Sequence, residues 1–397
     1  MKNKTLGCLL GGAVGDALGY AVEFKNYRDI IRRYGEKGIT RYELNRSGVA
    51  EISDDTQMTL FTAAGCLLGQ TRLYMRGIGG GLYEYCPYTY SDWLRTQTSS
   101  YQPNEPENVY TWLTRVPQLY ARRAPGNTCL QALQMGDRAH NNSCGCGGVM
   151  RTSPIALFGM QHSCADYGYI ASASAEAARI THKHPLGFIP SAALAYVLCE
   201  LASSNQSDYR KLDWAFDAAR RALPGTPSIN DDNKTYGELW PKEVRIMQEL
   251  MKKASALAKS KIDDVEAIRQ LGEGWTGHEA LAIAQYCALK HPSSFEDAIV
   301  AAVNHSGDSD STGSICGNIM GTFLGVDSIP DYYLQDLELR DVIMEIAEDL
   351  HDGCCIGDYI PMDTPEKLRW LNLYYFHVWK PKKEMLEECR KDLEHMP

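Results

Sequence analysis

The sequence has too little positive charge for a nucleic-acid backbone to be its main partner. Its 397 residues include 40 lysines and arginines against 50 aspartates and glutamates, which gives a formal net charge of −10. The basic groups are short and scattered, and none forms an extended patch. Because phosphate backbones are bound through clustered Lys and Arg, we do not expect a nucleic-acid partner.

Long apolar runs and the cysteine spacings of metal sites are also missing. The apolar run from Leu6 to Val14 follows two lysines, as in a signal peptide, but it is short, rich in glycine and soon interrupted by Asp16. We expect no other stretch to approach the length of a membrane span. The 13 cysteines are an odd number, and Cys144-Gly-Cys146 and Cys354-Cys355 lack the paired spacing of a zinc site. We therefore expect reduced thiols in a cytoplasmic protein without a membrane segment.

Runs of β-branched residues are scarce, whereas apolar residues recur at helical spacing along most of the chain. Residues 1–397 are therefore predicted to form one all-α domain with peripheral insertions. Residues 68–112 break this pattern and are predicted to form a long loop with short helices, whose tyrosines either stack on a ligand or pack. The polar stretch 203–262 is predicted to be peripheral, and residues 326–397 to form a helical C-terminal extension.

Two segments carry a glycine at every fourth position. These glycines are Gly7, Gly11, Gly15 and Gly19 in the first segment and Gly313, Gly317, Gly321 and Gly325 in the second. Glycine lowers helix stability, so a stripe of four indicates a helix whose backbone approaches another one closely. We predict two central, close-packed helices. For the first segment a glycine-rich loop is the alternative, because Gly11-Gly12 is a turn-forming pair.

The stretch 304–313 lies between two helical patterns and holds Asp308 and Asp310 among small hydroxyl residues. The preceding helix is predicted to start at Ser294, with Asp297 completing a capping box. Carboxylates at the start of the next helix would meet its unpaired N–H groups. Together with the neighbouring hydroxyls they also offer the hard oxygen ligands that Mg²⁺, Mn²⁺ or Ca²⁺ takes. The alternative is an ordinary acidic cap and turn.

A second acidic cluster, Ser53-Asp54-Asp55-Thr56-Gln57, opens another helical pattern far upstream. Adjacent residues inside a helix point about 100° apart, so Asp54 and Asp55 can share one site most easily where the helix begins. Carboxylates from two such clusters would repel each other strongly without a cation between them. The two helix starts therefore indicate two halves of one metal site.

The loop 145–151, with the sequence Gly-Cys-Gly-Gly-Val-Met-Arg, is a candidate ligand-binding loop. Its glycines allow backbone N–H groups to approach an anion closely. Arg151 either pairs with a phosphate or is a buried structural arginine, and the sequence favours neither. The spacing of His182 and His184 suits the positioning of a ligand or loop better than metal binding.

Six motifs, taken in order, resemble those of the ADP-ribosylglycohydrolase family, which includes the dinitrogenase reductase-activating glycohydrolases. They are GAVGDALGYAVEF at 12–24, SDDTQ at 53–57, GCGGVMRTSP at 145–154, HP at 184–185, GWTGHEALAIA at 274–284 and NHSGDSDSTG at 304–313. With the flanking glycine segments they span residues 7–325. The resemblance implies an all-α fold, a compact orthogonal bundle of helices, around a centre of two divalent cations, Mg²⁺ or Mn²⁺.

The resemblance also implies roles for individual residues. It assigns the metals to Ser53, Asp54, Asp55, Asp308, Asp310 and Ser311. It places Glu23 beside them, which makes Glu23, Asp54 and Asp55 the candidates for proton transfer or water orientation. The expected ADP-ribose-binding residues are Gly145, Cys146, Gly147, Gly148, Arg151 and His184. Many relatives look to have Asn at the position of Cys146, and Thr at those of Ser53 and Ser311, where serine keeps the hydroxyl.

The expected activity is hydrolysis of the bond at the anomeric carbon of an ADP-ribosyl group, most simply one on an arginine of an ADP-ribosylated protein. ADP-ribosyl-serine, O-acetyl-ADP-ribose and a modified nucleic-acid base are further possible substrates. Two alternatives are a catalytically silent protein that binds ADP-ribose or a nucleotide, and a metal phosphoesterase that acts on ADP-ribose. The complete set of six metal ligands with Glu23 favours the hydrolase over the silent binder.

Overall fold

Helices form nearly all of the regular structure in the computed structural model, which describes residues 1–103, 109–163, 166–204, 208–226, 239–356 and 364–375. Within these ranges there is no β-strand, and the only β-type pairings are three isolated bridges. The helices are α1 (Lys2–Tyr20), α2 (Tyr27–Tyr34), α3 (Asp54–Arg76), α4 (Cys86–Thr98), α5 (Asn127–Met135), α6 (Ser153–His162), α7 (Tyr167–Arg179), α8 (Pro185–Ala202), α9 (Tyr209–Ala222), α12 (Leu239–Ala258), α13 (Asp264–Leu271), α14 (Gly277–Lys290), α15 (Phe295–Val303), α16 (Ser309–Leu324), α17 (Asp331–Gln335), α18 (Arg340–Asp352) and α19 (Pro365–Trp370). The all-α prediction is confirmed.

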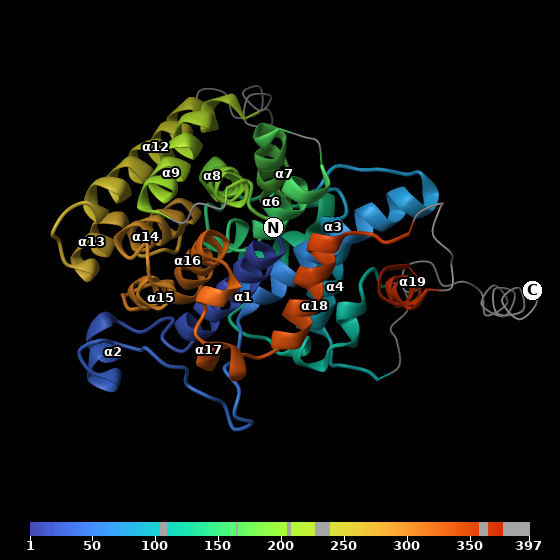
Figure 1. The fold of residues 1–397 in the computed structure, drawn as a ribbon, viewed down its shortest axis with the longest axis horizontal. Coiled ribbons are helices and arrows are strands. Elements are labelled where there is room, and N and C mark those ends of the chain that lie inside the picture. Colours follow the sequence, from blue (N-terminus) through green and yellow to red (C-terminus); the bar gives the residue numbers. More distant parts are fainter. Residues whose placement is uncertain (104–108, 164–165, 205–207, 227–238, 357–363, 376–397) are drawn as a thin grey trace, which may run out of the picture.

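Helices α1 and α16 pack against each other at the centre of the molecule, where α3, α14, α15 and α18 surround them (Figure 1). The two glycine stripes face each other in antiparallel register. A Cβ added to Gly11 would lie 2.5 Å from the carbonyl oxygen of Gly317, and a Cβ on Gly15 would overlap the backbone of Gly313. The prediction of two close-packed helices is therefore confirmed for these segments. Gly325 has another role, because it follows the last residue of α16 with a φ of +85°.

Helix starts also form where the sequence predicts them. Helix α15 follows Ser294, whose side chain accepts a hydrogen bond from the N–H of Asp297 at 3.1 Å. Helix α3 begins at Asp54, and α16 begins directly after Asp308. Both acidic clusters thus lie at helix N-termini, where unpaired N–H groups favour negative charge.

The break predicted over residues 68–112 is partly wrong. Helix α3 continues to Arg76, and α4 adds a further 13 residues. Tyr90 of α4 is fully buried, and its hydroxyl lies 2.7 Å from that of Thr62. This tyrosine therefore packs in the core and does not face a ligand.

Helix α12 corrects the prediction that residues 203–262 are peripheral. It packs against α8, α9 and α14, and its buried residues are spaced by three and four along one face. These residues are Val244, Met247, Met251 and Ala254. Lys252 and Lys253 are exposed on the other side of the helix, and such charged residues obscure the apolar periodicity in the sequence. The polar stretch 230–234 lies outside the described residues.

Helix α8 corrects the expectation that no stretch approaches the length of a membrane span. Its 18 residues have a mean hydropathy of 1.5, and 94% of them are buried inside the protein. Such burial is typical of a helix in the core of a globular protein.

The C-terminal helices form as predicted. Helix α18 buries an apolar face that includes Ile343, Ile346 and Leu350. Helix α19 follows Thr364, whose side chain caps it by accepting a hydrogen bond from the N–H of Lys367. Trp370, the last residue of α19, is buried, whereas Phe376 and Trp379 lie outside the described residues.

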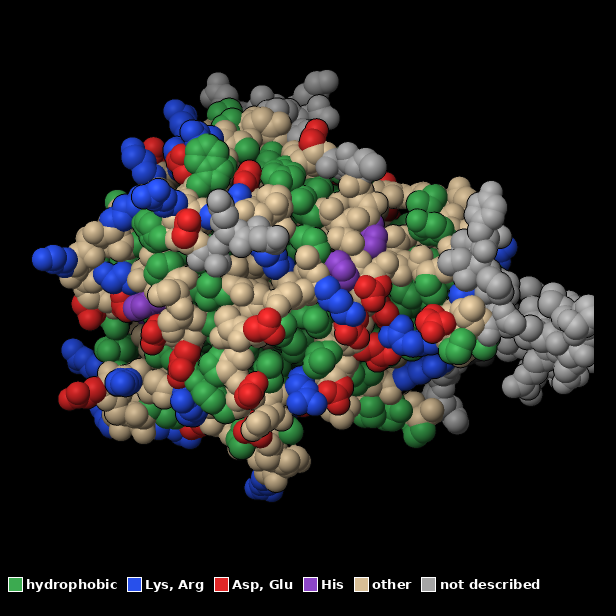
Figure 2. Space-filling model, viewed as in Figure 1, with side chains coloured by type: hydrophobic (Ala, Val, Ile, Leu, Met, Phe, Trp, Pro, Cys, Tyr) green, Lys and Arg blue, Asp and Glu red, His purple; other side chains and the backbone are tan. Residues whose placement is uncertain are grey.

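Surface charges of both signs are interspersed on the face shown in Figure 2, where no extended basic patch is visible. Cysteines in the apolar helices are free thiols in buried positions, in agreement with the predicted reduced state: Cys8, Cys66, Cys199, Cys287 and Cys316.

We expect Gly317→Ala to lower the free energy of unfolding by about 3 kcal/mol or more, at the upper end of overpacking costs. Alanine favours helix formation over glycine, but its Cβ would overlap the carbonyl oxygen of Gly11 and force α1 and α16 apart. Denaturant unfolding measures the loss. Gly225→Ala is the matched control, because nothing lies within 4 Å of a Cβ there. Equal stability of the two variants would contradict the close packing.

Candidate active site

The N-termini of α3 and α16 meet at one cleft of about 380 Å³. The cleft brings together most of the residues predicted for the site. These are Glu23, Asp54, Asp55, Gly145, Cys146, Gly147, Asp308, Asp310 and Ser311. The sequence motifs therefore converge in space although they are far apart in the chain.

Four predicted site residues do not line this cleft. Ser53 is fully buried behind it, where its hydroxyl caps α3 by accepting the N–H of Asp55 at 3.2 Å. Gly148 is buried against the backbone of Gly187. The other two, Arg151 and His184, are hydrogen-bonded outside the cleft to Thr181 and to the N–H of Leu186, respectively.

The carboxylates in the cleft have almost no contact with solvent. Asp54, Asp55, Asp308 and Asp310 are each 4% exposed or less, and Glu23 is 9% exposed. Loss of water raises the pKa of every one of these groups. The nearby charge of Asp310 is the second cause for Glu23, Asp54 and Asp55, and the pKa of Glu23 rises to about 10. The two acidic clusters are thus close enough to repel each other.

The donor set of the cleft suits hard divalent cations. It consists of carboxylate and hydroxyl oxygens, and two buried oxygens, Glu23 Oε2 and Asp55 Oδ2, have no hydrogen-bond partner. Other oxygens accept backbone N–H groups: Asp310 Oδ1 from Ser311 at 3.0 Å and Asp54 Oδ2 from Gly126 at 3.3 Å. No group of three or more His, Cys, Asp and Glu side chains among the described residues is already placed to hold a metal ion. The carboxylate side chains would have to rotate to hold a metal ion together.

Asp16 is a site-building residue that the sequence did not single out as such. It is fully buried in α1, and both of its carboxylate oxygens accept the N–H of Ser53, at 3.0 and 3.1 Å. Its Oδ2 also accepts the N–H of Thr56 at 3.0 Å and the hydroxyl of the same residue. Burial first, and Asp310 second, raise the pKa of Asp16 to about 7. A lone acid inside a glycine-rich apolar helix was the only indication of this role.

The loop 145–151 forms one wall of the cleft. The Cys146 thiol donates a hydrogen bond to Asp308 Oδ2 at 2.8 Å, and its backbone N–H donates to the carbonyl of Trp275 at 3.2 Å. Gly147 packs against His182, and a Cβ on this glycine would lie 2.9 Å from His182 Cε1. Cys146 therefore links the loop directly to the acidic cluster.

The geometry of Arg151 favours a buried structural arginine. Its side chain is fully buried, and it donates to the carbonyl of Gly147 at 2.6 Å and to the hydroxyl of Thr181 at 2.7 Å. Its guanidinium also lies over the ring of Tyr90, 4.7 Å from the centroid. Arg151 thus supports the loop from behind the cleft.

Of the two histidines, His182 lines the cleft and His184 does not. The ring of His184 caps α8 by accepting the N–H of Leu186 at 3.1 Å. His182 is 2% exposed, and burial, followed by the charge of Arg151, lowers its pKa to about 3. A neutral imidazole therefore faces the cleft beside the glycine loop.

An aromatic pair that the sequence did not indicate lies at the mouth of the cleft. Phe24 and Trp275 both line it, and their rings are stacked with centroids 5.4 Å apart and an interplanar angle of 21°. Phe24 is 71% exposed and has a φ of +62°, which is unusual for a bulky residue. This backbone conformation directs the ring outward directly after the buried Glu23.

The spatial convergence of these motifs is matched by the chain's similarity to known proteins. A family model described as ADP-ribosylglycohydrolase matches residues 1–357. The chain belongs to the ADP-ribosylglycohydrolase family. Members of this family hydrolyse ADP-ribose-linked substrates, so the protein is a hydrolase of this class.

Individual relatives agree with this assignment. The chain is 24% identical over 342 residues to the ADP-ribosyl-[dinitrogen reductase] glycohydrolase of Rhodospirillum rubrum, covering 86% of this chain and 92% of the relative. It is 26% identical over 219 residues to ADP-ribosylhydrolase ARH3 of Homo sapiens, covering 53% of this chain and 58% of the relative. A solved ADP-ribosylglycohydrolase-related protein complex superposes with a TM-score of 0.54 at 21% identity, covering 88% of this chain and 98% of the solved chain. The last similarity shows the shared fold.

In the presence of a chelator, we expect the acidic cluster to destabilise the protein as the pH rises from about 5 to about 8. The folded-state pKa values are raised above those of the unfolded chain. Stability from the protonated carboxyls is therefore fully present below the unfolded pKa and is lost as the pH rises through values such as about 7 for Asp16.

Asp310→Asn isolates this contribution, because Asp310 contributes to the raised pKa of Asp16, Glu23, Asp54 and Asp55. We expect the free energy of unfolding of Asp310→Asn, relative to that of the original protein, to increase by about 1–2 kcal/mol as the pH rises from about 5 to about 8. Chemical unfolding at each pH measures the difference. A difference that does not depend on pH would show that the carboxylates do not repel each other in solution.

Proposed function

We propose that the protein cleaves the bond at the anomeric carbon of an ADP-ribosyl group in a reaction that depends on two divalent cations, Mg²⁺ or Mn²⁺. The observation that supports this most directly is the convergence of buried carboxylates from two helix N-termini on one cleft beside a glycine loop. The proposal extends the family assignment to a specific bond and a metal requirement.

In this proposal the metals are held by Ser53, Asp54, Asp55, Asp308, Asp310 and Ser311. Bound cations would supply Lewis acidity toward ribose hydroxyls and water. The unpaired Asp55 Oδ2 supports this assignment, because a buried anionic oxygen without a partner is costly.

Glu23, Asp54 and Asp55 are the proposed groups for proton transfer and water orientation. Glu23 differs from the two aspartates in its placement, since it follows α1 and leaves Oε2 unpaired next to the cleft mouth. This oxygen is free to orient a water molecule or to hold a proton near the scissile bond. The aspartates are fixed by the first turn of α3.

The glycine loop is proposed to bind ADP-ribose through Gly145, Cys146 and Gly147. His182 and the segment 124–129 form the adjoining wall. The aromatic faces of Phe24 and Trp275, close to several carboxylates, would suit a planar cationic leaving group such as guanidinium. We therefore propose an ADP-ribosylated protein side chain, most simply arginine, as the substrate. The Rhodospirillum rubrum relative has a name that likewise refers to an ADP-ribosylated protein. A cytoplasmic location stays a prediction from the sequence.

Chromatographic analysis of the products tests the reaction. The purified protein is incubated with Mn²⁺ and ADP-ribosyl-arginine, ADP-ribosyl-serine or O-acetyl-ADP-ribose. Release of free ADP-ribose supports the proposal and identifies the linkage. AMP with ribose phosphate would identify a phosphoesterase, and unchanged substrate would identify a binding protein.

We expect Asp310→Asn to lower kcat/KM by about 100-fold or more, because it removes an anionic metal ligand. Asp341→Asn is the matched control, since Asp341 also lies in the first turn of a helix but is 85% exposed and pairs with Arg340 on the surface. Mn²⁺ titration by calorimetry and steady-state kinetics measure the two effects. Undiminished metal content and turnover in Asp310→Asn would contradict the ligand assignment.

We expect Gly147→Val to weaken ADP-ribose binding by about tenfold, or about 1.4 kcal/mol, and to change Mn²⁺ affinity much less. The new side chain would displace His182 and keep the ligand away from the loop backbone. Separate titrations of ADP-ribose and Mn²⁺ distinguish the effects. Normal ADP-ribose binding with reduced Mn²⁺ affinity would assign the loop to support of the metal site.

A further inference from the structure

Residues 50–53, which lead into the first turn of α3, are attached to the C-terminal part of the chain. The N–H of Ala50 donates to the carbonyl of Asp336 at 2.7 Å, and the N–H of Glu338 donates to the carbonyl of Ala50 at 3.1 Å. Ala50 and Leu337 thereby form a parallel bridge. The approach to the acidic helix start is thus fixed by a segment that lies beyond the sequence motifs.

A buried ion pair reinforces this attachment. Arg123 Nη2 donates to Glu338 Oε1 at 3.0 Å, and Arg123 Nη1 donates to Glu338 Oε2. The side chains of Arg123 and Glu338 are only 12% and 7% exposed. Such a bidentate contact requires the planar fork of arginine and fixes the relative position of both groups.

The same ion pair also holds both backbone polar groups of Ile52, the residue before Ser53. Arg123 Nη1 donates to the carbonyl of Ile52 at 3.0 Å, and the N–H of Ile52 donates to Glu338 Oε2 at 3.3 Å. Ser53, a proposed metal ligand, is the next residue. A shift of the Ile52 backbone would therefore move Ser53 and the start of α3 directly.

Through its backbone, Arg123 also connects this ion pair to residues 124–129, which form part of the cleft wall. Its carbonyl accepts the N–H of Asp54 at 3.2 Å. The chain then turns through Ala124, which has a φ of +48°, and the N–H of Gly126 donates to Asp54 Oδ2 at 3.3 Å. Residues 124–129 line the cleft. One arginine therefore sets the position of the acidic helix start and of the neighbouring loop.

We propose that Glu338 and Arg123 are positioning residues of the active site, so that the segment around residue 338 belongs to the catalytic unit. The proposal rests on the proposed function for the role of the carboxylates. Loss of the Glu338 carboxylate would leave Arg123 paired with Glu51, which is 37% exposed and 3.3 Å from Nη2. The guanidinium could then shift toward Glu51, and the backbone of Ile52 that it holds would shift with it. The expected effect is misplacement of metal ligands, to which affinity and turnover are sensitive.

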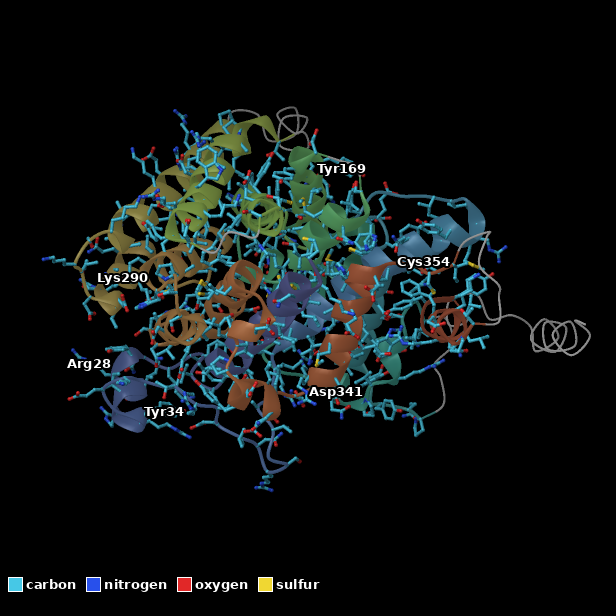
Figure 3. The ribbon with its side chains drawn as sticks, viewed as in Figure 1. Arg28, Tyr34, Tyr169, Lys290, Asp341 and Cys354 are labelled. Carbon is cyan, nitrogen blue, oxygen red and sulfur yellow. The ribbon has the colours of Figure 1, made fainter. Side chains whose placement is uncertain are left out.

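The test compares Glu338→Gln with Asp349→Asn in the full-length protein. Asp349 is the matched control, because its side chain is also 7% exposed and forms a bidentate pair with Arg369, at 2.7 and 2.9 Å. It does not line the cleft. Asp341, labelled in Figure 3, marks the start of α18 close after Glu338, whereas Asp349 lies near the other end of that helix.

We expect Glu338→Gln to weaken Mn²⁺ binding by about tenfold or more and to lower kcat more than it raises KM. Asp349→Asn should lower the melting temperature but leave Mn²⁺ affinity and kcat unchanged. Calorimetric Mn²⁺ titration, thermal unfolding and steady-state kinetics are measured below the melting temperature of each variant. Arg123→Lys, which keeps the charge but lacks the fork, should show the same loss in a milder form.

Equal losses of stability in Glu338→Gln and Asp349→Asn, with Mn²⁺ affinity unchanged in both and in Arg123→Lys, would overturn the proposal and leave Glu338 with a purely structural role. Failure of the proposed function gives a different result. The original protein would then bind Mn²⁺ but release no ADP-ribose, and the affinity comparison among the variants would still decide the positioning role.

Discussion

The burial of five carboxylates around one cleft is the constraint on which the rest of the site depends. Glu23, Asp54, Asp55, Asp308 and Asp310 are at most 9% exposed, so loss of water and mutual repulsion both favour their neutral forms. Such a cluster needs positive potential nearby. The protein supplies part of it through the N-termini of α3 and α16, and under the proposed function divalent cations supply the rest. The N-termini of α3 and α16 therefore help to stabilise the charged carboxylates of the site.

The close contact between α1 and α16 brings these groups together. Gly15 lies against Gly313, and Gly19 lies against Ser309, so the end of α1 is beside the first turn of α16. Asp16 then reaches the start of α3, and Glu23 follows directly into the cleft. Larger residues in the stripes would separate the helices toward the usual interaxial distance of about 8–10 Å. Glycines that weaken each helix by itself thus determine where the carboxylates meet.

Two arginines, the fully buried Arg151 and the partly buried Arg123, give the cleft walls a similar kind of support. Arg151 donates to the carbonyl of Gly147 in the glycine loop, and Arg123 donates to the carbonyl of Ile52 before α3. Each guanidinium is hydrogen-bonded to protein groups, and neither arginine lines the cleft. Arginine suits this role because it stays charged and offers several donors in a rigid plane. The backbone elements that carry the proposed ligands are therefore fixed from behind the cleft.

Local sequence determined the helix starts at Asp54 and after Asp308, the capping by Ser294 and the two glycine stripes, because caps and stripes depend on neighbouring residues and on regular spacing. Tertiary structure decided that the two stripes face each other. The motif resemblance indicated nine of the 19 residues that line the cleft. Tertiary structure alone decided that His182 faces the cleft, that Arg151 supports it from behind and that α12 packs inward. It also decided the pairing of Arg123 with Glu338, which are 215 positions apart. Contacts of this kind depend on how helices pack in three dimensions, and a short stretch of sequence carries no record of the distant partner.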